Sequence, residues 1–168
     1  MNPTESARSE REHRKRQAFI GREQDILSVS ERLMADKGIR KVSVDTIAAR
    51  TGIGKGTIYK HFDSKRGLLI AMATRHYDTL FELLGRSTDP AQALSDWIEA
   101  RLNGARQSML IRELTETLAD DSGALSKIQE SQVQMRKRLA KVLSGSSTTR
   151  GESVERAMLL ESLVQGAL

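Results

Sequence analysis

Three glycines and a lysine cluster in the stretch TGIGKGTIYKHF, residues 51–62. Glycine-rich loops that carry a lysine often bind phosphates, because small residues let backbone N–H groups surround the anion. A P-loop requires G-x-x-x-x-G-K-[ST], but Ala49 stands where the first glycine should be and Gly56 follows Lys55. The dinucleotide-binding pattern G-x-G-x-x-G fails as well, because Thr57 replaces the third glycine. Neither nucleotide-binding motif is therefore present.

The same stretch fits the turn and the second helix of a helix-turn-helix. Two short helices that cross at a steep angle need a turn of about three to four residues with a glycine that accepts positive φ, and Gly52 is placed for that role. The expected second helix, residues 55–62, starts between Gly54 and Gly56. Small residues there let the backbone approach the floor of a DNA major groove, and exposed N–H groups attract phosphates. The pattern favours a helix that contacts DNA.

Apolar periodicity predicts about eight helices and no convincing strand. The first, residues 19–37, has one apolar face and ends at Gly38. Ser43 is a good N-cap for the short helix before the turn, and Ser64 caps the long helix after it. Further helices are expected near residues 65–84, 90–102, 109–118, 125–142 and 152–168. The predicted fold class is all-α.

Composition excludes several classes of site. The chain of 168 residues contains no cysteine, 2 prolines and 3 scattered histidines. Disulfides and cysteine metal sites are excluded, no metal-binding motif is present, and no cofactor is expected. No apolar run approaches the roughly 20 residues that cross a bilayer, so we expect a cytoplasmic protein without membrane contact.

The net charge of +5 is located at the front of the chain. Residues 1–65 hold 14 Lys or Arg against 9 Asp or Glu, whereas residues 66–168 hold 13 of each. A neutral body with a basic front end suggests contact with a polyanion, although an ordinary solvated basic face explains the same charge. Residues 1–19 are polar and mixed in charge, so we expect a disordered basic arm that either follows DNA or only solubilises the protein.

The segment ILSVSERLMADKGIRKVSVDTIAARTGIGKGTIYKHFDSKRGLL, residues 26–69, resembles the DNA-binding domain of the TetR family of bacterial transcriptional regulators. The likeness covers the first amphipathic helix, both glycine turns, KGTIYKHF and the SK that opens the next helix. Two positions depart from the family pattern: Gly54 stands where a capping serine is common, and Gly67 replaces an acidic residue of a capping box. Both departures are expected to weaken the capping of the helix that follows. Neither removes an expected DNA contact.

The resemblance implies a DNA-binding surface on the turn and the second helix. Its base-reading residues would be Val44, Lys55, Gly56, Thr57 and Lys60. Among these, Lys55 suits guanine, and Val44 offers only a contact to a thymine methyl group. The phosphate contacts would be Ser43, Tyr59, His61 and Lys65. The alternatives are that Tyr59 and His61 are half-buried packing residues and that Lys65 only flanks its helix. No residue is expected to act catalytically.

The resemblance further implies a ligand-responsive repressor that binds a palindromic double-stranded DNA operator as a homodimer. Residues 20–65 would form the helix-turn-helix DNA-binding domain of three helices, and residues 66–168 a helical effector-binding and dimerisation domain. The pocket for a small-molecule effector is expected near six residues, although such residues are more often core. They are His76, Tyr77, Phe81, Trp97, Met109 and Met135.

Family dimers join through their last two helices. This sequence stops at VQGAL after one of them, so either a final helix is missing from the chain or the protein dimerises differently. Two other function classes stay open. An enzyme would need paired acid and base groups, for which only Asp120, Asp121 and His76 are candidates, more simply explained as a helix cap and a helix face. A DNA-binding scaffold or regulator without an effector is the more serious alternative, and an apolar cavity in the C-terminal part, or its absence, would separate it from a ligand-responsive regulator.

Overall fold

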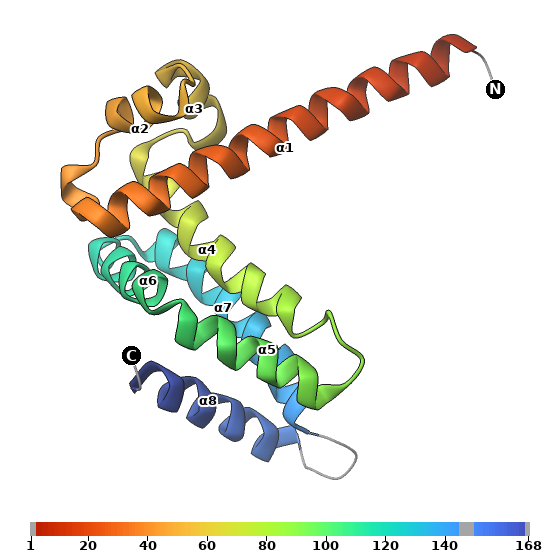
Figure 1. Ribbon diagram of the computed structural model, residues 1–168, viewed down its shortest axis with the longest axis vertical. Helices are drawn as coiled ribbons and strands as arrows, with labels where there is room; N and C mark the ends of the chain where they lie inside the picture. Colours follow the sequence, from red (N-terminus) through yellow and green to blue (C-terminus); the bar gives the residue numbers. More distant parts are fainter. Residues whose placement is uncertain (1–2, 145–149, 167–168) are drawn as a thin grey trace. The chain divides into compact units, whose positions relative to one another are not determined.

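The structure is a computed structural model that describes the backbone of residues 3–144 and 150–166. Within these ranges, side chains are described for residues 8–104, 106–144 and 154–164. Every regular element in this part of the chain is helical, which confirms the all-α fold class (Figure 1). The chain divides into two compact units, Met1–Leu68 and Leu69–Leu168.

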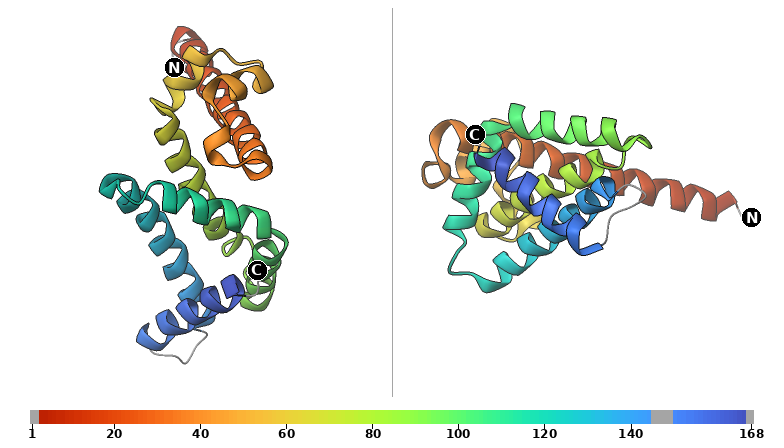
Figure 2. Two further views of the ribbon diagram at one scale, coloured as in Figure 1. Left: turned by 90° about the vertical axis from the view of Figure 1, so that its left-hand side faces the viewer. Right: turned by 90° about the horizontal axis from the view of Figure 1, so that it is seen from below.

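Unit 1 is built from three main helices and the start of a fourth. Its elements are α1 (Pro3–Lys37), the short 3-10 helix η1 (Ile39–Lys41), α2 (Val44–Thr51), α3 (Lys55–Phe62) and the beginning of α4 (Lys65–Leu83). The helices α2 and α3 lie beside the C-terminal half of α1 (Figures 1 and 2). The core between them consists of buried apolar side chains: Ile26, Leu27, Met34, Ile39, Val42, Ile47, Ile58, Phe62 and Leu68. Their burial fixes one face of α3 against the rest of the unit.

Two glycines with positive φ set the turns of unit 1. Gly38 follows α1 with φ 84°, and Gly52 ends α2 in the left-handed region with φ 69° and ψ 11°. A side chain is strained in such a conformation, so glycine is favoured at both positions. The hydroxyl of Ser43 caps α2 by accepting a hydrogen bond from the Thr46 N–H at 3.1 Å. These three local predictions are confirmed.

The glycine at position 67, which departs from the family pattern, has a local cause. A Cβ at Gly67 would collide with the carbonyl oxygen of Phe62, because the two backbone segments approach closely where α3 ends and α4 begins. The Gly67 N–H donates a hydrogen bond of 3.0 Å to the Ser64 hydroxyl, so Ser64 caps α4 as predicted. The residue therefore tightens this junction rather than loosening it.

The described part of the predicted disordered arm, residues 3–19, is instead the beginning of α1. Ion pairs one helical turn apart, Arg8–Glu12 at 3.2 Å and Arg14–Glu10 at 3.8 Å, support this extension. Extending a helix that is already anchored by packing costs less than starting one, because each added residue gains a backbone hydrogen bond. The prediction of disorder weighed only the lack of apolar burial and so missed this contribution.

Unit 2 continues α4 and adds four helices: α5 (Pro90–Asn103), α6 (Ala105–Thr117), α7 (Ser122–Leu143) and α8 (Arg150–Gly166). The carboxylates of Asp89 and Asp121 cap α5 and α7 by accepting hydrogen bonds from backbone N–H groups. Helix α8 packs against α7, and α5 contacts α6, α7 and α8. The core includes Leu69, Met72, Tyr77, Leu80, Trp97, Leu114, Leu118, Ile128, Met135 and Leu139.

A network of charged side chains lies inside unit 2. The Glu161 carboxylate accepts hydrogen bonds from Arg136 at 2.8 Å and Gln132 at 3.2 Å. Arg101 is only 4% exposed, and its guanidinium lies 3.3 Å from Nε2 of His76. Burial, together with the charge of Arg101, lowers the pKa of His76 to about 4. The imidazole is therefore neutral near pH 7, and its Nε2 can accept a hydrogen bond from Arg101.

Candidate nucleic-acid interface

One side of α3 is buried and the other faces solvent. Ile58 and Phe62 lie one helical turn apart on the buried side. The opposite side carries four exposed residues and one half-buried residue at its edge, and we call these five the outer face of α3. They are Lys55, Gly56, Tyr59, Lys60 and, at the edge, Thr57. The structure thus brings four of the five predicted base-reading residues together with Tyr59 on one surface.

Gly56 has no packing reason among the described residues to be glycine, whereas Gly54 is the N-cap of α3, a position where glycine is favoured over alanine. Neither has a positive φ, and a Cβ added at either position would meet no atom within 4 Å. A glycine inside a helix costs roughly 1 kcal/mol relative to alanine, so Gly56 weakens α3 without improving its packing. The small size of Gly56 therefore suits a partner that comes close to the backbone of α3.

The ammonium of Lys55, at the start of α3, is held by Asp45 of α2. Nζ lies 2.9 Å from the Asp45 carboxylate, and both side chains are largely exposed. The hydrogen bond to Asp45 and its negative charge raise the pKa of Lys55, so the side chain is cationic at neutral pH. An exposed pair of this kind adds little to folding stability, but it gives the ammonium a preferred direction.

Three predicted phosphate contacts, which we call the rim residues, are Ser43 at the N-cap of α2, Tyr59 on α3 and Lys65 at the start of α4. The Ser43 hydroxyl is exposed, caps α2 by accepting from the Thr46 N–H, and shares a hydrogen bond of 2.9 Å with the Thr46 hydroxyl in which either oxygen can donate. Tyr59 is exposed. The Lys65 ammonium donates to the carbonyl oxygen of Ile39 at 2.9 Å, which ties the start of α4 to η1. Among the described residues, the Lys65 ammonium makes no second hydrogen bond. Its contact with phosphate stays a prediction.

Two residues predicted to contact DNA are buried, so these two predictions are corrected. Val44 is 5% exposed and belongs to the core of unit 1, so it has no surface to offer a base. The His61 side chain is 1% exposed. Its ring stacks on Phe19 of α1 with the centroids 3.9 Å apart, and its Nδ1 lies 3.7 Å from the Glu23 carboxylate. His61 is therefore a packing residue, which is the alternative that the sequence left open.

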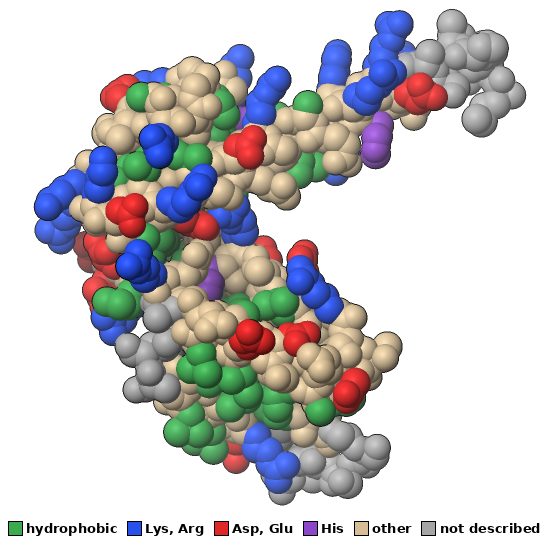
Figure 3. Space-filling view, in the orientation of Figure 1, with side chains coloured by type: hydrophobic (Ala, Val, Ile, Leu, Met, Phe, Trp, Pro, Cys, Tyr) green, Lys and Arg blue, Asp and Glu red, His purple; other side chains and the backbone are tan. Residues whose placement is uncertain are grey.

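Further exposed basic side chains lie on the elements that neighbour α3 in the sequence. On η1, α2 and the start of α4, the exposed ones are Arg40, Lys41, Arg50 and Arg66. Figure 3 shows Lys and Arg side chains along α1 and near the start of α2 on one side of unit 1. Clustered positive charge attracts a polyanion over several ångströms, independently of its sequence. Arg40, Lys41 and Arg50 belong to the charge excess of residues 1–65, and Arg66 follows directly after it.

The six residues predicted to line an effector pocket do not line one cavity together. Three of them belong to the core of unit 2: Tyr77, Trp97 and Met135. Met109 is 56% exposed on α6, so its assignment to an interior pocket is wrong. His76 is engaged with Arg101. Of the six, Phe81 alone lines the cavity of about 600 Å³ that unit 2 contains.

Among the described residues, no group of three or more His, Cys, Asp or Glu side chains is placed to hold a metal ion. In the same part of the chain, no helix combines the length and the hydrophobicity that crossing a bilayer requires.

Comparison with known proteins identifies the domain that carries the outer face of α3. The family model for bacterial regulatory proteins of the tetR family matches residues 26–72, from the middle of α1 into α4. The chain belongs to the TetR family. This TetR-family protein is 34% identical over 79 residues to the HTH-type transcriptional activator FasR of Mycolicibacterium smegmatis, covering 45% of this chain and 36% of FasR. It is 36% identical over 61 residues to the HTH-type transcriptional repressor KstR2 of Rhodococcus jostii, covering 36% of this chain and 30% of KstR2. The match thus spans about a third of the length of these curated relatives.

Solved structures share the fold over most of the TetR-family chain. A TetR transcriptional regulator from Legionella pneumophila has a TM-score of 0.68 at 22% identity and matches 84% of this chain and 82% of its own. A transcriptional regulator from Rhodococcus sp. Rha1 has a TM-score of 0.66 at 26% identity and matches 86% of this chain and 80% of its own. The likeness of fold therefore extends well beyond residues 26–72.

Proposed function

We propose that this TetR-family protein is a ligand-responsive transcriptional repressor that acts in the cytoplasm and binds a palindromic DNA operator as a homodimer. The observation that carries the proposal is Gly56, which leaves the backbone at the start of α3 open although no packing contact among the described residues requires a glycine there. A major groove admits a helix, and bare backbone beside Lys55 lets that helix approach the base edges.

In this proposal, the outer face of α3 supplies the base contacts and the rim residues supply the phosphate contacts. Lys55 and Lys60 donate to guanine O6 and N7, and Thr57 contacts a base edge beside Gly56. The rim residues Ser43, Tyr59 and Lys65 donate to phosphates and set the angle at which α3 enters the groove. The three-helix region of residues 20–65 forms the DNA-binding domain, and residues 66–168 form the effector-binding and dimerisation domain.

Homodimerisation is supported by the apolar surface of α8. Its exposed side chains include Val154, Met158, Leu159 and Leu163, the last of them 70% exposed. Figure 3 shows apolar side chains gathered over this helix. A second copy of the chain would cover them, and a twofold axis would double the number of bases read, because one helix in one groove reads too few.

Regulation by a small molecule is supported by the cavity of about 600 Å³ in unit 2, which falls within the usual range for ligand sites. A DNA-binding scaffold without an effector would be expected to have this space filled. The relatives include both a named activator and a named repressor. We propose repression because a dimer seated on a promoter can exclude polymerase without any further contact.

The test selects bound fragments from genomic DNA and measures their affinity by fluorescence anisotropy over a range of salt concentrations. Binding should weaken steeply as salt rises, with log K falling by about 0.9 per log unit of salt for each phosphate contact. Lys55→Ala should reduce discrimination between the selected site and a scrambled duplex by about tenfold, and Lys65→Ala should weaken binding to both duplexes alike. In transcription in vitro, the protein should lower the transcript from the selected promoter. Salt-independent binding, or unchanged discrimination by Lys55→Ala, would reject the proposal.

A further inference from the structure

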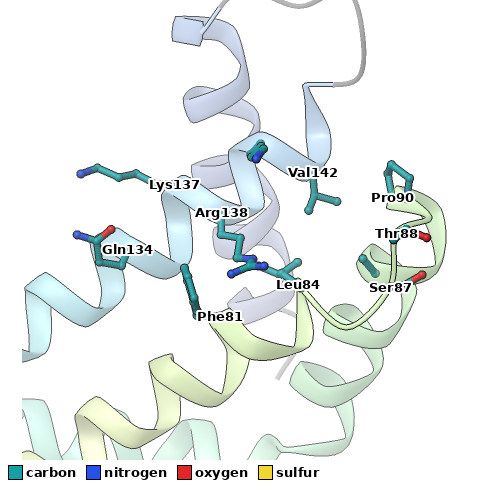
Figure 4. A pocket seen from close by; sticks show the side chains of 12 residues that line it. Phe81, Leu84, Ser87, Thr88, Pro90, Gln134, Lys137, Arg138 and Val142 are labelled. Carbon is teal, nitrogen blue, oxygen red and sulfur yellow. The ribbon is translucent and has the colours of Figure 1, made fainter.

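The cavity of unit 2 lies between the end of α4, the connection to α5, the start of α5 and the face of α7. Figure 4 shows that α7 contributes Gln134, Lys137, Arg138 and Val142 from one side, while Phe81, Leu84 and the Ser87–Pro90 segment approach from the other. Its volume of about 600 Å³ suits a small organic molecule rather than a single ion.

The charged side chains that line this cavity are all cationic. Lys137, Arg138 and Lys141 of α7 contribute three positive charges, and no Asp or Glu side chain is among the lining residues. Two acidic residues, Glu82 and Asp89, are adjacent in sequence to lining residues, and Asp89 caps α5 by accepting a hydrogen bond from the Ala91 N–H at 3.0 Å. Residues 66–168 as a whole carry no net charge, so this concentration is local. Three like charges that share a cavity repel one another, and an anion relieves that repulsion.

Arg138 has a defined position within the cavity. Its guanidinium carbon lies 4.4 Å from the centre of the Phe81 ring, a distance typical of a cation–π contact. It also lies directly against Gly85, where any Cβ would collide with the guanidinium. Figure 4 shows Arg138 extending from α7 toward Phe81 and Leu84. The fork of N–H donors is therefore held next to an apolar wall formed by Phe81 and Leu84.

We propose that this cavity binds a small amphipathic organic anion. Lys137, Arg138 and Lys141 hold its carboxylate or phosphate group, and its apolar part contacts Phe81, Leu84 and Val142. Arginine and lysine together favour such groups because the guanidinium offers paired donors and the ammonium groups add point charge. The inference rests on the proposed function in taking this ligand to be the effector, and it assigns the chemical class of the effector to residues that the sequence analysis did not select, apart from Phe81.

The proposed anion site is tested by isothermal titration calorimetry at constant ionic strength. The three probes share a naphthalene ring and differ in the attached group: 1-naphthoate, 1-naphthyl phosphate and neutral 1-naphthamide. We expect saturable binding of at least one of the two anions, at least tenfold tighter than that of the amide. The stronger of the two anions identifies the preferred group. The double variant Lys137→Gln, Lys141→Gln should weaken anion binding at least tenfold. Gly85→Ala, which displaces the Arg138 guanidinium, should weaken it as well.

Lys127→Gln is the matched control, because Lys127 is an exposed lysine on the same helix α7 that does not line the cavity. It should bind the anions as the wild type does. Equal binding of amide and anions, no binding of either anion, or unchanged binding by the double variant would overturn the inference. Binding of ligand-free protein to DNA is measured separately. Failure of DNA binding with intact anion binding would reject the regulator proposal alone, and the reverse result would reject the anion site alone.

Discussion

The Lys55 ammonium lies 2.9 Å from the Asp45 carboxylate, so the cation best placed to read a base is tied to an anion on the preceding helix. The pair has two opposite effects on DNA binding. The negative charge of Asp45 repels phosphates, while its hydrogen bond fixes the direction in which Lys55 presents its remaining protons. If Lys55 reads a base as proposed, we expect Asp45 to restrain general affinity for DNA and to sharpen the choice of sequence.

The variant Asp45→Asn should therefore bind random duplex DNA several-fold more tightly than the wild type and discriminate less between the operator and a scrambled duplex. Fluorescence anisotropy on both duplexes at several salt concentrations measures the two effects. Asp36→Asn is the matched control, because it removes the same charge from an exposed position in the last turn of α1. Unchanged affinity and discrimination in Asp45→Asn would show that the pair has no part in reading DNA.

The variant His61→Gln tests whether His61 packs against α1 rather than holding a phosphate. Losing the stack of His61 on Phe19 should lower the free energy of unfolding by about 1 kcal/mol. The dependence of DNA affinity on salt should stay the same. Urea unfolding and a salt titration measure these two quantities, and Tyr59→Phe, which removes only an exposed hydroxyl, should show the opposite pattern of unchanged stability and weaker binding. A shallower salt dependence in His61→Gln at full stability would restore the phosphate contact.

The His76 imidazole predicts how the stability of unit 2 depends on pH. Its pKa is lowered from 6.5 to about 4 in the folded protein, mainly by burial. Below pH 6.5 the unfolded chain takes up a proton that the folded protein refuses until about pH 4, so the free energy of unfolding falls as pH falls through this window. The loss from this group reaches about 3 kcal/mol, since each pKa unit corresponds to about 1.4 kcal/mol.

Urea unfolding followed by the fluorescence of Trp97, the single tryptophan of the chain, measures this loss in unit 2. His76→Asn keeps an acceptor for Arg101 and does not titrate, so it should lose about 3 kcal/mol less than the wild type between pH 6.5 and 4. His13→Asn, at an exposed position of α1, should follow the wild type. If His76→Asn loses as much stability as the wild type, His76 is not the group responsible.

Most helix ends of unit 1 could be predicted from the residues next to them in the sequence. Gly38 and Gly52 end helices because glycine accepts positive φ, and Ser43 caps α2 because its hydroxyl reaches a free N–H. These features depend on residues close in sequence. The outer face of α3 followed from the same periodicity, because Ile58 and Phe62 had to be buried together.

Contacts between residues far apart in the sequence could not be predicted from local sequence patterns. The burial of His61 depends on Phe19, some forty residues earlier, and the ion pair of Lys55 depends on how α2 crosses α3. The cavity of unit 2 is a further case: its residues come from α4, α5 and α7, and helical periodicity says which face of each helix is apolar but not which helices meet. Of the six residues predicted for an effector pocket, Phe81 alone lines this cavity, and its contact with an effector stays a prediction.

The central claim is that the backbone at the start of α3 is kept bare for DNA, and Gly56→Ala tests it against Gly21→Ala. Both glycines lie within helices, and a Cβ at either would meet no atom within 4 Å. Each alanine should stabilise the fold by up to about 1 kcal/mol, because alanine is the better helix former. We predict that operator affinity, measured by fluorescence anisotropy, falls at least tenfold in Gly56→Ala and is unchanged in Gly21→Ala. Equal operator affinity of the two variants would contradict the account.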